Sequence, residues 1–285
     1  MISTEPIPPT TTPTAAPEWD EQLLRNPHAV ADKRRRVQKM FAAIAPSYDL
    51  NNHLHSLWMD QSWRRKAVNL AGLKEADTVV DVACGTGDLS IKFAESLYPL
   101  ALPGRPGQVT GIDFTFEMLP IAVRKWREHG IVEPTREGPH ANPGAAEFVK
   151  FVNGDAQSLP LPNACCDVVS IAFGIRNVAD PAAAIREFYR VLRPGGRLII
   201  LEFSLPTNPV LRGVYNFYFR KVLPRTATLI SGDKTGAYKY LPESVNTFIG
   251  REQMADMMGD AGFKDVSQHP LTFGVCVAYR GVVAR

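Results

Sequence analysis

The chain has 285 residues, of which 45% are hydrophobic, and its formal net charge at pH 7 is +3. It is long enough to bury a full core, and so small a net charge gives no argument for a nucleic-acid partner. No run of eighteen or more apolar residues occurs, so we expect no membrane-spanning helix. The sequence starts without a basic and then apolar segment, which favours a cytoplasmic protein.

The first segment is rich in Pro, Thr and Ala and poor in large apolar residues. This composition predicts a disordered tail over residues 1–25, followed by a single domain over residues 26–285. From Ala29 to Ala45 apolar residues recur at helical spacing, and basic residues including Lys33 and Arg34 occupy the other side. This basic face either meets water on a packed helix or contacts a membrane surface.

The segment from Pro46 to His53 is polar and turn-rich, and it contains Tyr48. A segment of this kind just before a cofactor-binding strand folds over the site as a lid, or else it is only a connector. We therefore interpret residues 26–76 as a helical lid region.

Residues 78–89 begin with a β-branched run, break at Gly85 and Gly87, and continue into helix-compatible sequence. This pattern predicts a strand, a tight turn and a helix. Glycines let a ligand lie against bare backbone, and the free N–H groups of the new helix face it. The third glycine of a dinucleotide fingerprint is replaced by Ser90, so the match to that motif is partial.

Three acidic residues follow three predicted strands. Asp81 lies in the turn region, Asp113 ends the strand at 108–112, and Asp155, followed by Ala156, comes after the strand at 147–152. Parallel strands deliver such residues to one edge of a sheet, and an acidic residue after the second strand suits the hydroxyls of a ribose. The three carboxylates suit a ligand with a cation, a sugar and an adenine better than a pyrophosphate, so they indicate S-adenosylmethionine.

Strands and helices alternate along the rest of the chain. This alternation predicts an α/β fold with a doubly wound, mostly parallel, seven-stranded sheet whose last strand is antiparallel. Two Pro/Gly-rich stretches, 98–107 and 133–144, are expected to be surface insertions. Residues 205–250 form a further insertion that is rich in aromatic and basic residues. It lines an apolar substrate channel, touches a bilayer, or packs on the sheet as an extra helix.

The sequence resembles the UbiE/MenG family of quinone-biosynthesis C-methyltransferases, which act on polyprenyl benzoquinols or demethylmenaquinol. The resemblance runs from about Met40 to Val282. The segments that carry it are Met40–Asn52, Asp81–Asp88, Phe173–Val178, Arg190–Leu198, Leu201–Ser204 and Tyr238–Ser244. The glycine loop alone implies only a class I methyltransferase, whereas the segments after residue 173 are more specific.

The resemblance implies that Thr86, Asp113 and the pair Asp155 and Ala156 contact the cofactor. Together with the residues of the turn, the expected cofactor site comprises Asp81, Gly85, Thr86, Gly87, Asp113, Asp155 and Ala156. A serine common in the family's fourth strand is replaced here by Ala172, and Ser170 is an imperfect substitute. The resemblance also implies a polyprenyl quinol as partner, and it leaves open a transient contact with the inner face of the membrane and a homodimer.

A sulfonium methyl is already electrophilic, so the enzyme mainly has to align a nucleophilic carbon behind it and exclude water. A quinol carbon becomes a good nucleophile when its hydroxyl loses a proton, so the site needs a group that favours the phenolate. We expect Arg176 and Tyr48 to orient and activate the substrate, with Asn177 as their hydrogen-bonding support. His53 and His55 are candidates for direct base chemistry, and no metal is required.

We expect demethylmenaquinol as the substrate, in menaquinone biosynthesis, with the benzoquinol of ubiquinone biosynthesis as the alternative. A nucleic-acid methyltransferase is disfavoured because the chain carries no basic RNA-binding module. A membrane-binding protein without enzymatic activity is disfavoured because the polar edge of the sheet is complete.

Overall fold

A computed structural model describes residues 19–100, 107–130, 148–233 and 235–285. In this part of the chain seven strands form one sheet, in the order β3-β2-β1-β4-β5-β7-β6. Their bounds are Thr78–Val82 (β1), Gln108–Asp113 (β2), Val149–Asn153 (β3), Cys166–Ala172 (β4), Leu192–Phe203 (β5), Lys264–Leu271 (β6) and Cys276–Val282 (β7). β1 to β5 pair in parallel, and β7 is antiparallel to both of its neighbours. The predicted fold class is therefore confirmed.

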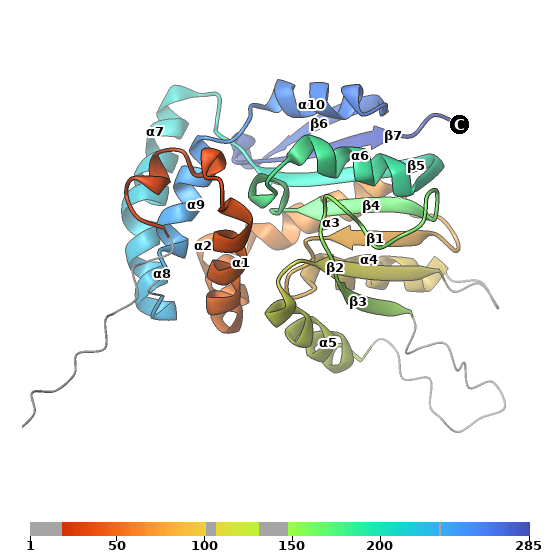
Figure 1. Cartoon of the computed structure of the whole chain (residues 1–285), viewed down its shortest axis with the longest axis horizontal. Helices are drawn as coiled ribbons and strands as arrows, with labels where there is room; N and C mark the ends of the chain where they lie inside the picture. Colours follow the sequence, from red (N-terminus) through yellow and green to blue (C-terminus); the bar gives the residue numbers. More distant parts are fainter. Residues whose placement is uncertain (1–18, 101–106, 131–147, 234) are drawn as a thin grey trace, which may run out of the picture.

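Helices cover both faces of this sheet (Figure 1). They are α3 (Met59–Ala71), α4 (Asp88–Leu97), α5 (Leu119–Glu128), α6 (Pro181–Val191) and α10 (Arg251–Asp260). Successive strand residues point to opposite faces. Val79 of β1 accordingly packs with Phe93 of α4, whereas Val80 packs with Phe188 of α6. The hydrophobic core thus consists of two layers, and the helices of each layer bury one face of the sheet.

A helical cap lies beyond the carboxyl ends of the parallel strands (Figure 1). It combines the lid region with the insertion that follows β5, segments far apart in the sequence. Its helices are α1 (Lys33–Ile44), α2 (Tyr48–His55), α7 (Pro209–Phe217), the π-helical η8 (Tyr218–Val222), α8 (Leu223–Ser231) and α9 (Ala237–Asn246). A third apolar cluster, which includes Met40, Tyr215 and Tyr240, joins the two segments.

The described residues begin at Trp19, within the segment that the composition predicted to be a disordered tail. The Trp19 side chain is only 1% exposed, and its ring centroid lies 4.4 Å from that of Tyr240. Residues 23–25 form a 3₁₀ turn. Burial of a large aromatic side chain in the cap thus extends the domain toward the N-terminus. Residues 1–18 of the predicted tail, the predicted insertion at 133–144 and residues 101–106 of the other insertion lie outside the described residues.

The pattern of α1 predicted that Lys33 lies on the outer side of the helix, and this prediction is wrong. It is 2% exposed, and its Nζ donates to the carbonyl oxygens of Arg176 (2.8 Å) and Val178 (2.7 Å). Burial and the charge of Arg176 lower the pKa of Lys33 to about 8. A buried amine is tolerated because these carbonyls satisfy its protons. α1 is therefore anchored to the loop that carries Arg176.

Among the described residues, no helix is both long and apolar enough to cross a membrane.

Candidate active site

The glycine loop joins β1 to α4 at the carboxyl edge of the sheet. Gly85 and Gly87 have φ values of 54° and 87°, in the left-handed region that favours glycine. A Cβ added to Gly87 would lie 3.0 Å from Cβ of Ala122, so α5 also needs a glycine there. The Gly85 N–H donates to Oδ2 of Asp113 at 2.8 Å, which fixes the loop against the end of β2.

Asp113 is an 8% exposed carboxylate that ends β2. Its second oxygen accepts the N–H of Thr115 at 2.7 Å. Burial raises the pKa of Asp113, and the hydrogen bonds from Thr115 and Gly85 counteract part of this rise. A carboxylate offers about four lone-pair sites, so Asp113 retains acceptor capacity for a pair of hydroxyls.

A cavity of about 110 Å³ lies beside Asp113. Four of the predicted cofactor residues line it, namely Gly85, Asp113, Asp155 and Ala156. Arg34 of α1 closes its rim: the guanidinium pairs with Asp155 at 2.9 Å and lies 4.4 Å from the ring centroid of Phe114. The convergence predicted from the strand ends is thus seen for Asp113 and Asp155, and a basic residue of the lid covers it.

The other three predicted cofactor residues, Asp81, Thr86 and Gly87, do not line this cavity. Asp81 is 1% exposed and accepts hydrogen bonds from the hydroxyls of Ser90 (2.6 Å) and Ser170 (2.7 Å). Burial raises the pKa of Asp81 to about 6, although both hydroxyls oppose the shift. Ser170 therefore binds Asp81 and does not take the place of a serine at position 172. The hydroxyl of Thr86 donates to Asp49 at 2.5 Å and so ties α2 to the loop.

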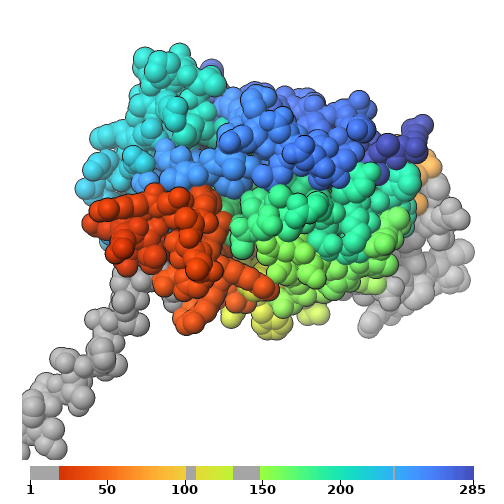
Figure 2. Space-filling model, turned by 45° about the horizontal axis from the view of Figure 1, so that its top comes forward, coloured from red at the N-terminus to blue at the C-terminus, as the bar shows by residue number. Residues whose placement is uncertain are grey.

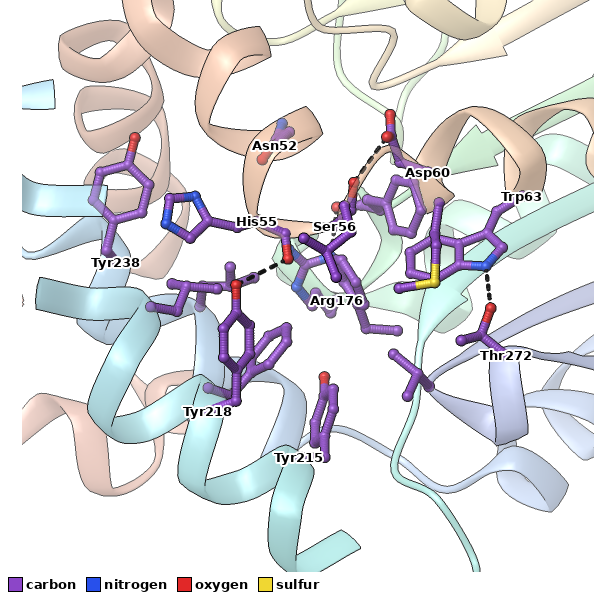
Figure 3. A pocket seen from close by; sticks show the side chains of 18 of the residues that line it. Asn52, His55, Ser56, Asp60, Trp63, Arg176, Tyr215, Tyr218, Tyr238 and Thr272 are labelled. Atoms are coloured by element: carbon purple, nitrogen blue, oxygen red, sulfur yellow. Dashed lines mark hydrogen bonds between the residues drawn. The ribbon is translucent and has the colours of Figure 1, made fainter. Parts of the chain in front are cut away.

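A larger, mainly apolar cavity of about 340 Å³ (Figure 3) has lining residues in common with the first one. Aromatic side chains from α3 and from the α7–α9 insertion line it, including Trp63, Tyr215 and Tyr218. Phe41, Tyr48 and Phe173 line both cavities. The cavities therefore share a wall, and the segment around Tyr48 packs over the site, as a lid does, instead of acting only as a connector.

Arg176 lines the larger cavity and is 4% exposed. Its Nη1 pairs with Oε1 of Glu202 at 2.6 Å and donates to the carbonyl of Phe173 at 2.7 Å. Burial alone would lower the pKa of Arg176, but the Glu202 carboxylate raises it. Sequence reasoning missed the role of Glu202. The one signal in the sequence was its place within Leu201–Ser204, a segment that carries the family resemblance and ends a buried strand.

Asn177 lies next to Arg176 in the chain but lines the smaller cavity. Its Oδ1 accepts the hydroxyl of Tyr240 at 2.9 Å, and its Nδ2 donates to the Phe173 carbonyl at 3.3 Å. Arg176 donates to that same carbonyl. The side chains of Asn177 and Arg176 thus share an acceptor, the Phe173 carbonyl.

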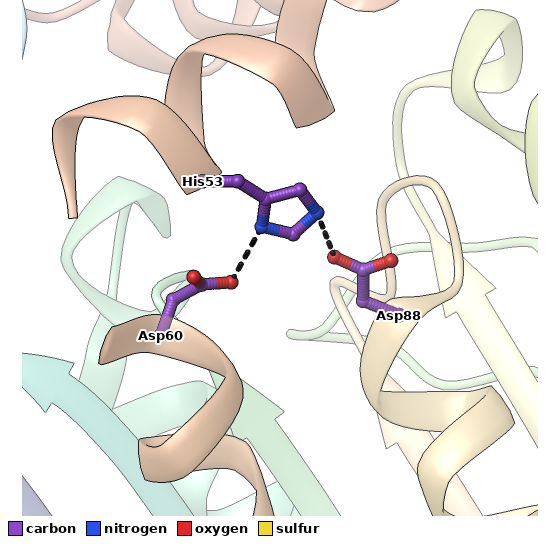
Figure 4. A group of neighbouring side chains, drawn as sticks. All are labelled: His53, Asp60 and Asp88. Carbon is purple, nitrogen blue, oxygen red and sulfur yellow. Dashed lines mark hydrogen bonds and ion pairs between the residues drawn. The ribbon is translucent and has the colours of Figure 1, made fainter. Parts of the chain in front are cut away.

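The two candidate histidines differ in their surroundings. His55 lines the larger cavity and contacts the Thr226 hydroxyl at 2.8 Å. His53 lies between Asp60 and Asp88 (Figure 4), and the ligand atoms of these three side chains are all within 4.8 Å of one another. Arg64 and Lys125 already pair with the two carboxylates, so this donor set does not suit a bound cation.

The site therefore joins a small cavity with carboxylates to a large apolar cavity across one wall. The donor set of the small cavity fits S-adenosylmethionine, because Asp113 can accept from ribose hydroxyls and Asp155 from an adenine amine. The larger cavity fits an apolar acceptor. Such an arrangement suits transfer of a group from a polar donor to an apolar acceptor with water excluded.

Comparison with known proteins shows extensive similarity. The profile of the ubiE/COQ5 methyltransferase family matches residues 29–283. The demethylmenaquinone methyltransferase of Thermus thermophilus is 44% identical over 242 residues, which cover 85% of this chain and 99% of that protein. The ubiquinone/menaquinone biosynthesis C-methyltransferase UbiE of a Geobacter species is 39% identical over 254 residues, covering 89% and 99% of the two chains.

Solved structures share the fold at low sequence identity. An S-adenosylmethionine-dependent methyltransferase of Thermotoga maritima aligns with a TM-score of 0.55 at 20% identity, covering 86% of this chain and 99% of that chain. One from Aquifex aeolicus aligns with a TM-score of 0.52 at 18% identity, covering 78% and 89%.

Proposed function

Because the chain belongs to the ubiE/COQ5 methyltransferase family, we propose that it methylates a ring carbon of a polyprenyl quinol, specifically demethylmenaquinol. It is an S-adenosylmethionine-dependent methyltransferase. The observation that carries the proposal is the wall of Phe41, Tyr48 and Phe173 between the two cavities. A donor on one side and an apolar ring on the other would meet there.

S-adenosylmethionine supplies an electrophilic methyl group, and this chain's residues hold and orient the reactants. In our proposal Asp113 accepts hydrogen bonds from the ribose, while Asp155 and Ala156 contact the adenine. Gly85 offers bare backbone to the ligand. Asp81 contributes negative charge from behind the loop, and Thr86 and Gly87 hold the shape of the loop.

In our proposal Arg176 and Tyr48 orient and activate the substrate, and Asn177 supports them. Arg176 donates hydrogen bonds to the developing phenolate, and its pairing with Glu202 keeps it in place. Burial raises the pKa of Tyr48, so its hydroxyl remains protonated and can donate to the substrate oxygen. Asn177 holds Tyr240 and the Phe173 carbonyl around the same point.

Purified protein, given methyl-labelled S-adenosylmethionine and demethylmenaquinol in detergent, is expected to produce labelled menaquinol. The matching benzoquinol of ubiquinone biosynthesis serves as the competing substrate. Faster methylation of the benzoquinol would favour that alternative, which the names of several relatives also include. If neither quinol gained label, the proposed function would be wrong.

We also propose that the outer face of α7 contacts the lipid bilayer that supplies the substrate. Val210, Val214 and Phe217 are 73%, 65% and 66% exposed, at the spacing of one helix face. Val214 and its neighbour Leu211 also line the larger cavity, so this face continues into it. The exposed Arg212 and Lys221 suit anionic lipid headgroups. Figure 2 shows this segment, coloured turquoise, projecting from one corner of the molecule.

Replacing both Val210 and Phe217 by Ser is expected to weaken binding to anionic phospholipid vesicles about 30-fold, because each substitution loses roughly 1 kcal/mol of apolar contact. Turnover of a short-chain quinol in detergent should not change, because neither residue lines the cavity. Leu100→Ser, a matched change of a 37% exposed leucine at η4 (Tyr98–Leu100), is the control in vesicle sedimentation. Equal binding of both variants would rule out the α7 contact.

A further inference from the structure

His53 lies between two carboxylates that come from different helices. Its Nδ1 is 2.9 Å from Oδ2 of Asp60, in the first turn of α3. Its Nε2 is 3.7 Å from Oδ2 of Asp88, at the start of α4. Figure 4 shows the imidazole ring between them, with one nitrogen toward each carboxylate. The three side chains therefore lie in one row, hydrogen-bonded between Asp60 and His53 and separated by 3.7 Å between His53 and Asp88.

The inner end of this row reaches the apolar cavity. Asp60 lines that cavity although the residue is only 3% exposed. Its Oδ1 accepts the hydroxyl of Ser56 at 2.8 Å, and Ser56 lines the cavity as well. A buried carboxylate is tolerated only where polar partners surround it, and Asp60 has them while still reaching the cavity wall.

The outer end of the row reaches the surface. Asp88 lines an open hollow of about 320 Å³, together with Lys92, Glu95 and His129. This hollow and the apolar cavity share none of their lining residues. The His53 side chain is 20% exposed. The row thus leads from the substrate cavity to the outside.

Two cations balance the carboxylates of this row. Arg64 of α3 lies 3.5 Å from Asp60 and 3.8 Å from Asp88, and Lys125 of α5 pairs with Asp88. Burial alone would raise the pKa of Asp88, but Arg64 and Lys125 lower it. Gln61 donates to Asp60 at 3.1 Å. An imidazole has two ring nitrogens, one of which can accept a proton while the other releases one, and His53 presents one nitrogen to each carboxylate.

The proposed reaction produces a proton. The hydroxyl of the quinol loses its proton, the ring carbon forms a bond to the methyl group, and the carbon–sulfur bond breaks with its electron pair going to sulfur. The ring carbon then loses its hydrogen, the electron pair of that bond restores aromaticity, and the oxygen regains a proton. In sum, one proton leaves for each methyl group transferred. A cavity that excludes water needs a route for it.

We infer that Asp60, His53 and Asp88 form a proton path from the substrate cavity to the surface, with Asp60 as the first acceptor. Asp60 takes the hydroxyl proton, His53 receives it at Nδ1 and releases it from Nε2, and Asp88 passes it to the outer hollow. This inference rests on the proposed function. It assigns the general base to the interface of α2 and α3, and leaves Arg176 to stabilise the anion.

The test compares His53→Gln and Asp60→Asn with the wild type in the quinol methylation assay from pH 5.5 to pH 8.5. The wild-type kcat should rise with pH, because a proton path through an imidazole operates only when the ring is neutral. His53→Gln should lose that rise and turn over about 100-fold more slowly at pH 7.5, at the low end of losses for proton-transfer groups. Added imidazole should restore part of its rate. Asp60→Asn should lower kcat at least as much.

His269→Gln, the same change on β6 at the far edge of the sheet, is the matched control and should behave as the wild type. The KM for the quinol and the calorimetric Kd of S-adenosylmethionine should stay within about threefold for His53→Gln. An unchanged rate and pH profile in His53→Gln would overturn the path. So would a loss of rate that keeps the pH dependence and lowers the Tm, since packing alone would then explain it. Absence of methylation by the wild type would instead refute the proposed function, and the path with it.

Discussion

Arg176→Ala is expected to lower the free energy of unfolding by about 3–5 kcal/mol, the usual loss when one partner of a buried ion pair is removed. The substitution leaves the carboxylate of Glu202, which is 2% exposed, without its cation. It also removes a donor to the Phe173 carbonyl, which Asn177 shares. Methyl transfer should fall below detection, because the developing phenolate loses its guanidinium. Chemical denaturation and the labelled assay measure the two effects.

A double variant separates stability from chemistry. Arg176→Met combined with Glu202→Gln removes both charges while keeping similar volumes, and replacing a buried pair in this way is often neutral. We expect it to regain most of the stability that Arg176→Ala loses and none of the activity. Recovered turnover in the double variant would show that Arg176 serves only the fold. A single variant of unchanged stability would show that the pair with Glu202 contributes little.

Asp113→Ala is expected to weaken S-adenosylmethionine binding by about 100-fold, since two hydrogen bonds to a charged group contribute at least about 3 kcal/mol. The same change releases the N–H groups of Gly85 and Thr115, which shape the floor of the cofactor cavity. Calorimetric titration with S-adenosylmethionine measures the effect.

Asp113→Asn is the matched comparison for this position. It keeps one oxygen, but its amide NH2 takes the place of the other oxygen and faces one of the two backbone N–H donors. We expect an intermediate loss of S-adenosylmethionine affinity, about tenfold. The amide oxygen still accepts one hydrogen bond, but without the negative charge of the carboxylate. The KM for the quinol should change little in both variants, because Asp113 lines only the smaller cavity. Wild-type affinity in Asp113→Ala would discard the ribose role.

The lid and the sheet are held together by polar contacts as well as by the apolar cluster of the cap. Arg34 pairs with Asp155, Asp49 accepts from Thr86, and Lys33 donates to the Arg176 loop. Each contact joins α1 or α2 to a segment at the carboxyl edge of the sheet. The lid helices thus contribute both to the wall between the two cavities and to the closure of the cofactor side.

Local patterns determined much of the fold and part of the site. A β-branched run specifies a strand, a pair of glycines specifies the turn after it, and an apolar pattern of helical period specifies the next helix. Each of these signals comes from residues that are close together in the sequence. Parallel strands then bring their carboxyl ends to one edge, which is why the amino-acid sequence alone places Asp113 and Asp155 together.

Only the tertiary structure decided which charges meet. Arg176 and Glu202 are 26 residues apart, Lys33 and the Arg176 carbonyl 143, and no local pattern encodes either contact. The hydrophobic pattern predicted Lys33 on the solvent side of α1. In the structure the helical cap packs so that Lys33 is buried against the carbonyl oxygens of Arg176 and Val178. His53 likewise has the sequence context of a loop histidine, whereas the packing of α2, α3 and α4 places it between Asp60 and Asp88. Helical and strand periodicity reports local geometry, whereas a buried ion pair depends on how distant elements pack.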